Sequence, residues 1–372
     1  MKNPLTGEQY LERKITKNYF PRTDYFRDQT AIIHSMPFRR LKQKTQVIFS
    51  PQNDHVCTRI EHVLHVASIA ATICKGINAS NNAWNLNEEL AYAIGVGHDL
   101  GHAPFGHSGE KVLSDLLGGG NSFIHEVNSF RVVEYLANNG EGMNLTYAVK
   151  DGIICHCGEK YEKEIEPRKN YIDLNEIKDR KEYPSTFEGC ITRFSDKIAY
   201  FGRDLEDAVL AKLIAKDEIP SSIQKELGKS NGEIINTLVI DIIENSKNNG
   251  SIKFSEEKHR LILELRDFNN KYIYNHRKIL KWRTHGERII KVLFEYLLDL
   301  YDRNGKNIKK YYKDDSNKLD QIFANYLKKM IPFYKKEDTA PKQIIADYIS
   351  GMTDEFALKC MEYISIPEPL DF

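Results

Sequence analysis

The stretch that decides the fold is HDLGHAPFGHSGE, residues 98–110. It places three histidines, an aspartate and a glutamate within thirteen positions, together with three glycines and one proline. Glycine lets the backbone approach a ligand closely and weakens a helix in which it merely sits. We therefore expect the stretch to build a polar site between helices, and not to be one regular helix.

Helical periodicity surrounds this stretch on both sides. Apolar residues from Ile60 to Cys74 recur at i, i+3, i+4 and i+7, which predicts a helix with one apolar stripe, ended with the help of Gly76. Further helices are expected over residues 88–99, 108–117, 126–137, 145–156, 186–214, 286–300 and 344–364, the last interrupted at Gly351.

Strand signals are few, and the best short candidates are Thr45–Phe49 and Ser251–Phe254. Residues 159–183 are rich in charge and are interpreted as a loop or insertion. The predicted fold is all-α: a helical bundle around one site, with a helical C-terminal extension. Residues 1–215 would form the core, and 216–372 would pack on it as part of the same structural unit.

Composition limits the function. Lys+Arg and Asp+Glu both number 53 in 372 residues, so binding to polyanions through overall charge is excluded, although a local basic patch is not. No stretch approaches the ~20 consecutive apolar residues of a membrane span, and the polar start predicts a cytoplasmic protein that does not engage a membrane. The six cysteines show no disulfide spacing, and Cys155-His156-Cys157 lacks the second thiol pair of a zinc finger.

Four groups are candidate metal ligands: His62, the doublet His98-Asp99, and Asp196. Imidazoles and carboxylates together suit a divalent cation such as Mn, Fe, Zn or Mg, and four of them leave positions for water. Each signal is weak alone, since a single histidine on an apolar face is more often a core residue.

The sequences of several segments resemble those of the HD-domain deoxynucleoside triphosphate triphosphohydrolases, in particular their dGTPase-like branch. The similarity extends from about Phe38 to Ala357. The spacing His62, His98-Asp99, Asp196 resembles their H…HD…D signature. Residues 98–110 carry the resemblance, as do FRRL (38–41), KTQV (44–47), NDHV (53–56), TR (58–59), SDKIAY (195–200) and DYISGMTD (347–354). The chain is short for that family, and residues 159–183 match nothing in it.

The resemblance implies roles for thirteen side chains. It assigns the metal to His62, His98, Asp99 and Asp196, and a catalytic dyad to His107 and Glu110. It places Arg59, His102, His125 and Lys197 around a triphosphate, and Gln43, Tyr200 and Asp204 around a deoxyribose. For several of these, a plainer interpretation stays open: His102 and His125 as helix-capping groups, Tyr200 as a core aromatic, Asp204 as a surface charge. His156 is interpreted as structural, with a role in the site left open.

By the same resemblance, the reaction would convert a dNTP, either dGTP or several dNTPs, into deoxynucleoside and tripolyphosphate, with Mn, Mg or another transition metal. A homo-oligomer such as a hexamer, and activation by a second nucleotide, are also implied. Two alternatives stay open. One is a different HD nucleotide phosphatase or phosphodiesterase; the other is a non-catalytic protein that binds nucleotides or single-stranded DNA. Basic and aromatic residues interleave at 306–313 and 328–336, which we interpret mainly as helix surface or subunit interface.

Overall fold

The regular structure is almost entirely helical, which confirms the all-α prediction. The computed structural model describes residues 1–372 except 17–18, 49–54, 158–159, 314–315 and 367–372. In the described residues the strands are β1 (Glu164–Ile165) and β2 (Ile252–Lys253), which pair antiparallel with Glu164 opposite Lys253. Helices that only connect larger elements are α1 (Gly7–Leu11), α3 (Met36–Arg40), α8 (Ala137–Gly140) and α11 (Ser221–Glu226).

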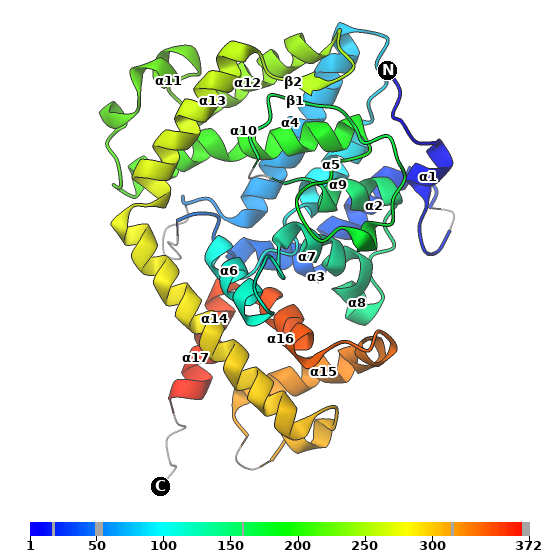
Figure 1. Ribbon diagram of the computed structural model, residues 1–372, viewed down its shortest axis with the longest axis vertical. Coiled ribbons are helices and arrows are strands. Elements are labelled where there is room, and N and C mark those ends of the chain that lie inside the picture. Colours follow the sequence, from blue (N-terminus) through cyan, green and yellow to red (C-terminus); the bar gives the residue numbers. More distant parts are fainter. Residues whose placement is uncertain (17–18, 49–54, 158–159, 314–315, 367–372) are drawn as a thin grey trace.

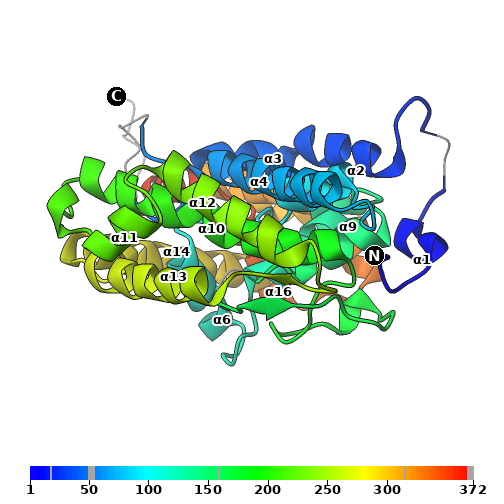
Figure 2. The ribbon, with the colours of Figure 1, turned by 90° about the horizontal axis from the view of Figure 1, so that it is seen from above.

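Two long helices form the centre of the first hydrophobic cluster: α4 (Arg59–Ser80) and α10 (Phe187–Leu210). On α10 lie α12 (Asn231–Ser246) and α13 (Glu256–Asn269), so α10 and α12 separate α4 from α13 (Figure 2). Polar side chains cap the N-termini of both central helices. Glu61 accepts from the N–H of Thr58 at 2.7 Å before α4, and the Thr186 hydroxyl accepts from Gly189 N–H at 3.0 Å before α10.

The second cluster is built from helices of the N-terminal half. It joins α2 (Asp24–Ile33), α5 (Glu88–Gly97), α7 (His125–Arg131) and α9 (Tyr147–Ile154), with α5 packed between α4 and α2. A π-helical segment, residues 132–136, continues α7, where the sequence predicted one helix over 126–137. Cys155 is buried in this cluster, and Cys74 and Cys190 are buried in the first one.

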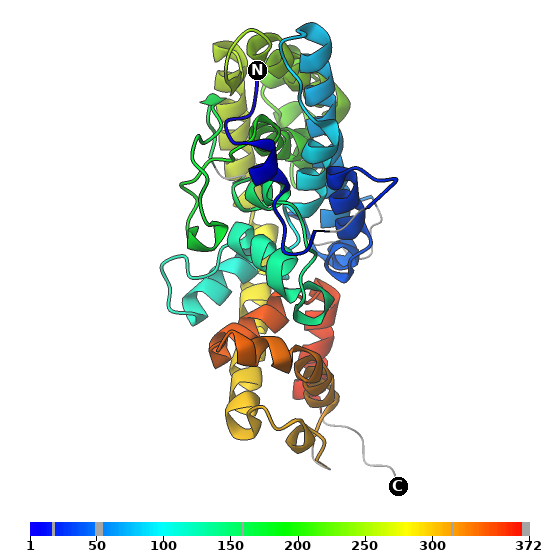
Figure 3. The ribbon, with the colours of Figure 1, turned by 90° about the vertical axis from the view of Figure 1, so that its right-hand side faces the viewer.

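The third cluster lies in the lower half of the molecule (Figures 1 and 3). The long α14 (Arg277–Asn304) descends from the upper bundle and packs on α6 (His107–Leu116) and α16 (Pro341–Ser350). With α15 (Lys318–Lys336) and α17 (Asp354–Ser365) these helices enclose apolar residues that include Cys360. The chain breaks between α16 and α17 at Gly351, as predicted.

Two local predictions were wrong. Helix α4 does not end near Gly76 but continues to Ser80, because Gly76 serves there as a packing position: a Cβ on it would lie 2.3 Å from Cδ1 of Ile243 on α12. The predicted strand at 45–49 is only a single bridge from Thr45 to Thr58, and Phe49 lies outside the described residues.

Helix α4 also has the length and hydropathy that a membrane crossing needs, with a mean hydropathy of 1.2 over its best window. Half of that window is buried inside the protein, and it contacts α5, α10 and α12. A core helix of a bundle has these same properties, so its apolar composition is explained by the packing.

Candidate active site

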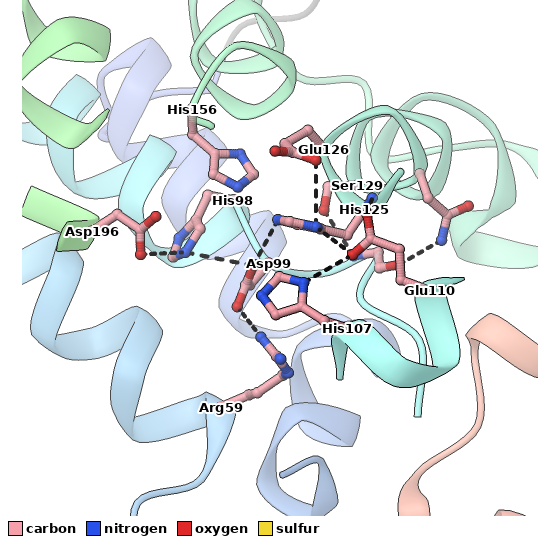
Figure 4. A network of polar contacts seen from close by, with 12 residues as sticks. Arg59, His98, Asp99, His107, Glu110, His125, Glu126, Ser129, His156 and Asp196 are labelled. Atoms are coloured by element: carbon pink, nitrogen blue, oxygen red, sulfur yellow. Dashed lines mark hydrogen bonds and ion pairs between the residues drawn. The ribbon is translucent and has the colours of Figure 1, made fainter. Parts of the chain in front are cut away.

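The four predicted metal ligands come together where the first two clusters meet. His62 lies on α4, Asp196 on α10, and His98 and Asp99 directly follow α5; all four are buried. His62 Nε2 is 3.0 Å from Asp196 Oδ1, and His98 Nε2 is 3.7 Å from Asp99 Oδ1 and 3.8 Å from Asp196 Oδ1. Figure 4 shows His98, Asp99 and Asp196 converging from separate elements.

The backbone fixes how His98 faces this space. Its Nδ1 is 2.7 Å from the carbonyl oxygen of Gly95, three residues earlier, so Nδ1 carries the proton and Nε2 keeps its lone pair. Nε2 is buried and has no hydrogen-bond partner among the described residues. An orphaned buried nitrogen beside two carboxylates fits a divalent cation, so this donor set suits the metal that the sequence predicted.

His156 belongs to the same space, although the sequence interpretation treated it as structural. Its Nδ1 lies 2.6 Å from the carbonyl oxygen of Ile153, again three residues earlier, and its buried Nε2 has no partner in the described chain. Its ring is 4.8 Å from that of His98, and burial lowers the pKa of His156 to about 4. Like His98, His156 follows the end of an apolar helix, but that position alone does not show whether the ring faces a site or the core.

Charge compensates the buried carboxylates. Burial alone would raise the pKa of Asp99, but the Arg59 guanidinium, which donates to its Oδ2, and the neighbouring histidines hold it well below the usual value. For Asp196, burial is likewise outweighed by the hydrogen bond from His62 and by nearby imidazoles, and its pKa is also lowered. Both groups therefore present charged oxygens to the space between them.

His107 and Glu110 form the predicted pair in the first turn of α6. His107 Nδ1 is 3.2 Å from Glu110 Oε2; the glutamate is buried while the imidazole is 58% exposed. Glu110 Oε2 is also 2.9 Å from His125 Nδ1. Burial would raise the pKa of Glu110, but these two histidines hold it well below its usual range. The pair thus combines a buried, charged Glu110 carboxylate with a His107 imidazole that reaches solvent.

Arg180 and Glu126 complete this network, and neither was among the predicted residues. Arg180, from the charged segment 159–183, donates through Nη2 to Glu110 Oε1 and through Nε to Glu126 Oε1, both at 2.7 Å. Glu126 Oε2 lies 3.3 Å from His125 Nδ1. Burial alone would lower the pKa of His125, yet Glu126 and Glu110 raise it to about 10. No local pattern links residue 180 to residue 110, so only the fold could reveal this contact.

The approach of α7 to the 98–110 segment depends on Gly101. A Cβ there would lie 2.1 Å from the backbone nitrogen of Ser129. The glycine N–H donates to the Ser129 hydroxyl at 2.9 Å, and its carbonyl accepts from the Asn128 amide at 2.6 Å. This contact brings His125, at the start of α7, next to His107, with the two ring centroids 5.6 Å apart.

A cavity of about 370 Å³ opens in front of these groups. Its wall contains His62, Asp99 and Asp196, the dyad residue His107, and the predicted substrate residues Arg59, His102, His125, Tyr200 and Asp204. It also contains residues that the sequence did not single out: Gln46, Phe105, Tyr161, Tyr274, Trp282 and Arg283 among others.

Gln43 and Lys197, two further predicted substrate residues, are not among the residues that line this cavity. The Gln43 amide donates to Glu355 at 2.7 Å on the surface. Lys197 is buried, donates to the carbonyl of Arg193 at 3.1 Å, and is 3.4 Å from Glu162. A motif assigns a residue to a region of the fold but does not fix the direction of a long side chain.

The far end of the cavity carries hydroxyl and carboxyl groups. Tyr200 and Tyr161 share a hydrogen bond of 2.7 Å between their hydroxyls, and the Tyr274 hydroxyl donates to Asp204. Burial raises the pKa of Asp204 to about 7. Asp196, Tyr200 and Asp204 form one stripe of α10, so a single helix face connects the metal ligands to this end.

Comparison with known proteins agrees with these observations. Residues 59–200 match the HD domain, and residues 252–363 match the phosphohydrolase-associated domain. A deoxyguanosinetriphosphate triphosphohydrolase-like protein of Caldanaerobacter subterraneus subsp. tengcongensis is 38% identical over 94% of this chain and 86% of its own length. Proteins with the same description from Desulfatibacillum aliphaticivorans and Clostridium tetani are 37% and 35% identical, covering 94% and 93% of this chain and 89% and 87% of their own.

Proposed function

The chain belongs to the HD-domain family of deoxyguanosinetriphosphate triphosphohydrolase-like proteins, and on that premise we propose that it hydrolyses deoxynucleoside triphosphates to deoxynucleoside and tripolyphosphate. Membership makes it a metal-dependent phosphohydrolase. One observation carries the finer proposal: His62, Asp99 and Asp196 of the donor set line the same cavity as His107, the exposed member of the His107–Glu110 pair, and the cavity wall also carries hydroxyl and carboxyl groups suited to a sugar.

The metal would be held by His62, His98, Asp99 and Asp196, with His156 beside them. Such an ion supplies Lewis acidity that polarises a phosphoryl oxygen and offsets the charge of the transition state. The donor set admits Mn or another transition metal, or Mg.

The protein's own groups would do the rest. Arg59, His102 and His125 would bind the triphosphate, whose roughly four negative charges need several cationic or N–H donors. His107 would move a proton, from the attacking water or to the leaving 5′-oxygen, while Glu110 fixes its ring. Tyr200 and Asp204 would bind the deoxyribose. Gln43 and Lys197 receive no role in this scheme, since their side chains are engaged elsewhere.

The test is product analysis. The purified protein, supplied with Mn²⁺, Mg²⁺ or Fe²⁺, is incubated with each dNTP alone and in pairs, and the products are identified by mass spectrometry. Tripolyphosphate with free deoxynucleoside supports the proposal. Orthophosphate or pyrophosphate would identify a different HD phosphatase or phosphodiesterase, and binding of dNTP or single-stranded DNA without turnover would identify a non-catalytic protein.

The pairwise mixtures also test the two further proposals that follow from the family. If a second nucleotide activates the enzyme, turnover appears in a mixture and not with either nucleotide alone. If the chain forms a homo-oligomer such as a hexamer, light scattering of the same samples gives a mass that is a multiple of 43.0 kDa.

A further inference from the structure

The phosphohydrolase-associated region lines the cavity directly with residues such as Tyr274 and Trp282, and one of its carboxylates also bonds to two other segments of the wall. We propose that Asp354 is a positioning residue: it holds two segments of the cavity wall, so that the C-terminal region completes the active site and is not merely appended to it. The inference about catalysis rests on the proposed function, whereas the inference about wall geometry does not.

Asp354 is the first residue of α17 and is 2% exposed. Its Oδ1 accepts from the backbone N–H of Phe105 at 2.8 Å, and its Oδ2 accepts from the backbone N–H of Thr45 at 2.9 Å. Thr45 and Phe105 both line the cavity, yet they are sixty residues apart in the chain. The Asp354 carboxylate therefore joins two segments of the cavity wall through charge-assisted hydrogen bonds, which are stronger than neutral ones.

The carboxylate is not needed to begin α17. The N-cap of that helix is Thr353, whose hydroxyl accepts from the N–H of Phe356 at 3.1 Å. Asp354 thus points away from its own helix and toward the HD core. A capping role alone would not direct both of its oxygens to residues of another region.

The contact with Asp354 stabilises an unusual backbone conformation at Phe105. Phe105 has φ +63°, a conformation that non-glycine residues rarely adopt and that the surrounding structure must hold in place. His107 follows two residues later and begins α6. The Phe105 ring also packs edge-on against Trp282 of α14, with centroids 5.7 Å apart. The C-terminal region therefore fixes the peptide that aims His107 into the cavity.

Lys44 supplies a second connection between the same three segments. This buried ammonium donates to the carbonyl of His102 and, at 2.8 Å, to the carbonyl of Ser350 at the end of α16. The Lys44 carbonyl in turn accepts from Arg59 N–H at 3.1 Å. Lys44 and Asp354 together tie residues 350–354 to both cavity segments.

The chain contains a matched control. Asp347 of α16 is buried like Asp354 and also joins the C-terminal region to the core, through two bonds of 2.8 and 2.7 Å to Arg131 of α7. Neither Asp347 nor Arg131 is part of the described cavity wall. Asp347→Asn therefore weakens an equivalent inter-region contact without touching that wall.

The experiment compares Asp354→Asn with Asp347→Asn in the full metal-loaded chain. Asparagine offers one carbonyl oxygen where two carboxylate oxygens accept, so one N–H loses its partner. Hydrogen exchange in the peptides that contain Thr45 and Phe105 should accelerate by at least about tenfold in Asp354→Asn and stay unchanged in Asp347→Asn. With dNTP, kcat should fall by about 10–100-fold in the first variant with KM within about threefold, and by less than about twofold in the second.

Unchanged exchange at both amides in Asp354→Asn would overturn the proposal, as would equal changes in the two variants. If Asp354→Asn does not fold, Lys44→Met is measured in its place, with accelerated exchange at Phe105 as the supporting result and unchanged exchange as the opposing one. If the wild type turns over no dNTP, the proposed function fails, and the exchange data still decide the role of Asp354.

Discussion

The two halves of the candidate active site are built in different ways. The metal-ligand half is buried and lies on or beside the core helices α4, α5 and α10, where a carbonyl three residues earlier sets the ring of His98. The dyad half, His107 and Glu110, lies on the short α6, is part-exposed, and depends on Arg180 and Asp354 from distant segments. The ring of His98 is thus oriented by its local backbone, while the orientation of His107 and Glu110 depends on contacts with distant segments.

The largest effect is expected in the buried half. His98→Ala and Asp99→Ala each remove one of the four proposed ligands, so metal content should be lost and turnover should fall by at least about 10³-fold. Elemental analysis of the purified variants, together with product assays, checks this. A variant that keeps both the metal and the activity would show that the four groups are not the ligand set.

The dyad half should separate metal binding from rate. His107→Ala is expected to leave metal content at the wild-type level and to lower kcat by about 10²–10⁴-fold, the range for losing a general acid or base. Loss of the metal in this variant would erase the distinction between the halves, because the exposed imidazole would then be a ligand.

A smaller effect is expected for Arg180→Gln. The variant loses two charge-assisted bonds to Glu110 and Glu126, so the orientation of the dyad relaxes and kcat should fall by about tenfold with metal content unchanged. The matched control is Arg168→Gln. Arg168 lies in the same 159–183 segment as Arg180, and its ion pair to Asp151 of α9 lies away from the cavity. Equal rate losses in the two variants would indicate general damage to the segment.

The last prediction concerns stability and pH, and not the rate of the reaction. Asp204 shares α10 with Asp196, yet burial raises the pKa of Asp204 to about 7 from its usual 3.8. Between those two pH values the folded state holds a proton that the unfolded state has released, so the free energy of unfolding falls as pH rises and levels off above pH 7. Urea unfolding of wild type and Asp204→Asn from pH 4 to 8 should show the variant gaining on the order of 2–4 kcal/mol relative to wild type across that window. A difference independent of pH would mean that Asp204 titrates normally.

The contrast between the halves also explains what the sequence could predict. The apolar periodicity predicted the core helices, and the four candidate ligands could be named because their residue types and spacing resemble the H…HD…D signature of a known family. Arg180 could not be predicted, because its partner Glu110 is seventy residues away in sequence. His156 was left open because nothing local distinguishes an imidazole that faces a site from one that faces a core. The prediction that Gly76 helps end its helix was wrong because a glycine inside a helix can also allow close packing against a neighbouring helix.

The buried cysteines give the three hydrophobic clusters separate reporters. Cys190 lies in the first cluster, Cys155 in the second and Cys360 in the third, and burial raises the pKa of each thiol. A buried thiol reacts with an alkylating reagent only while its surroundings are open. The labelling rates of these three cysteines therefore report how often each hydrophobic cluster opens, without any engineered probe.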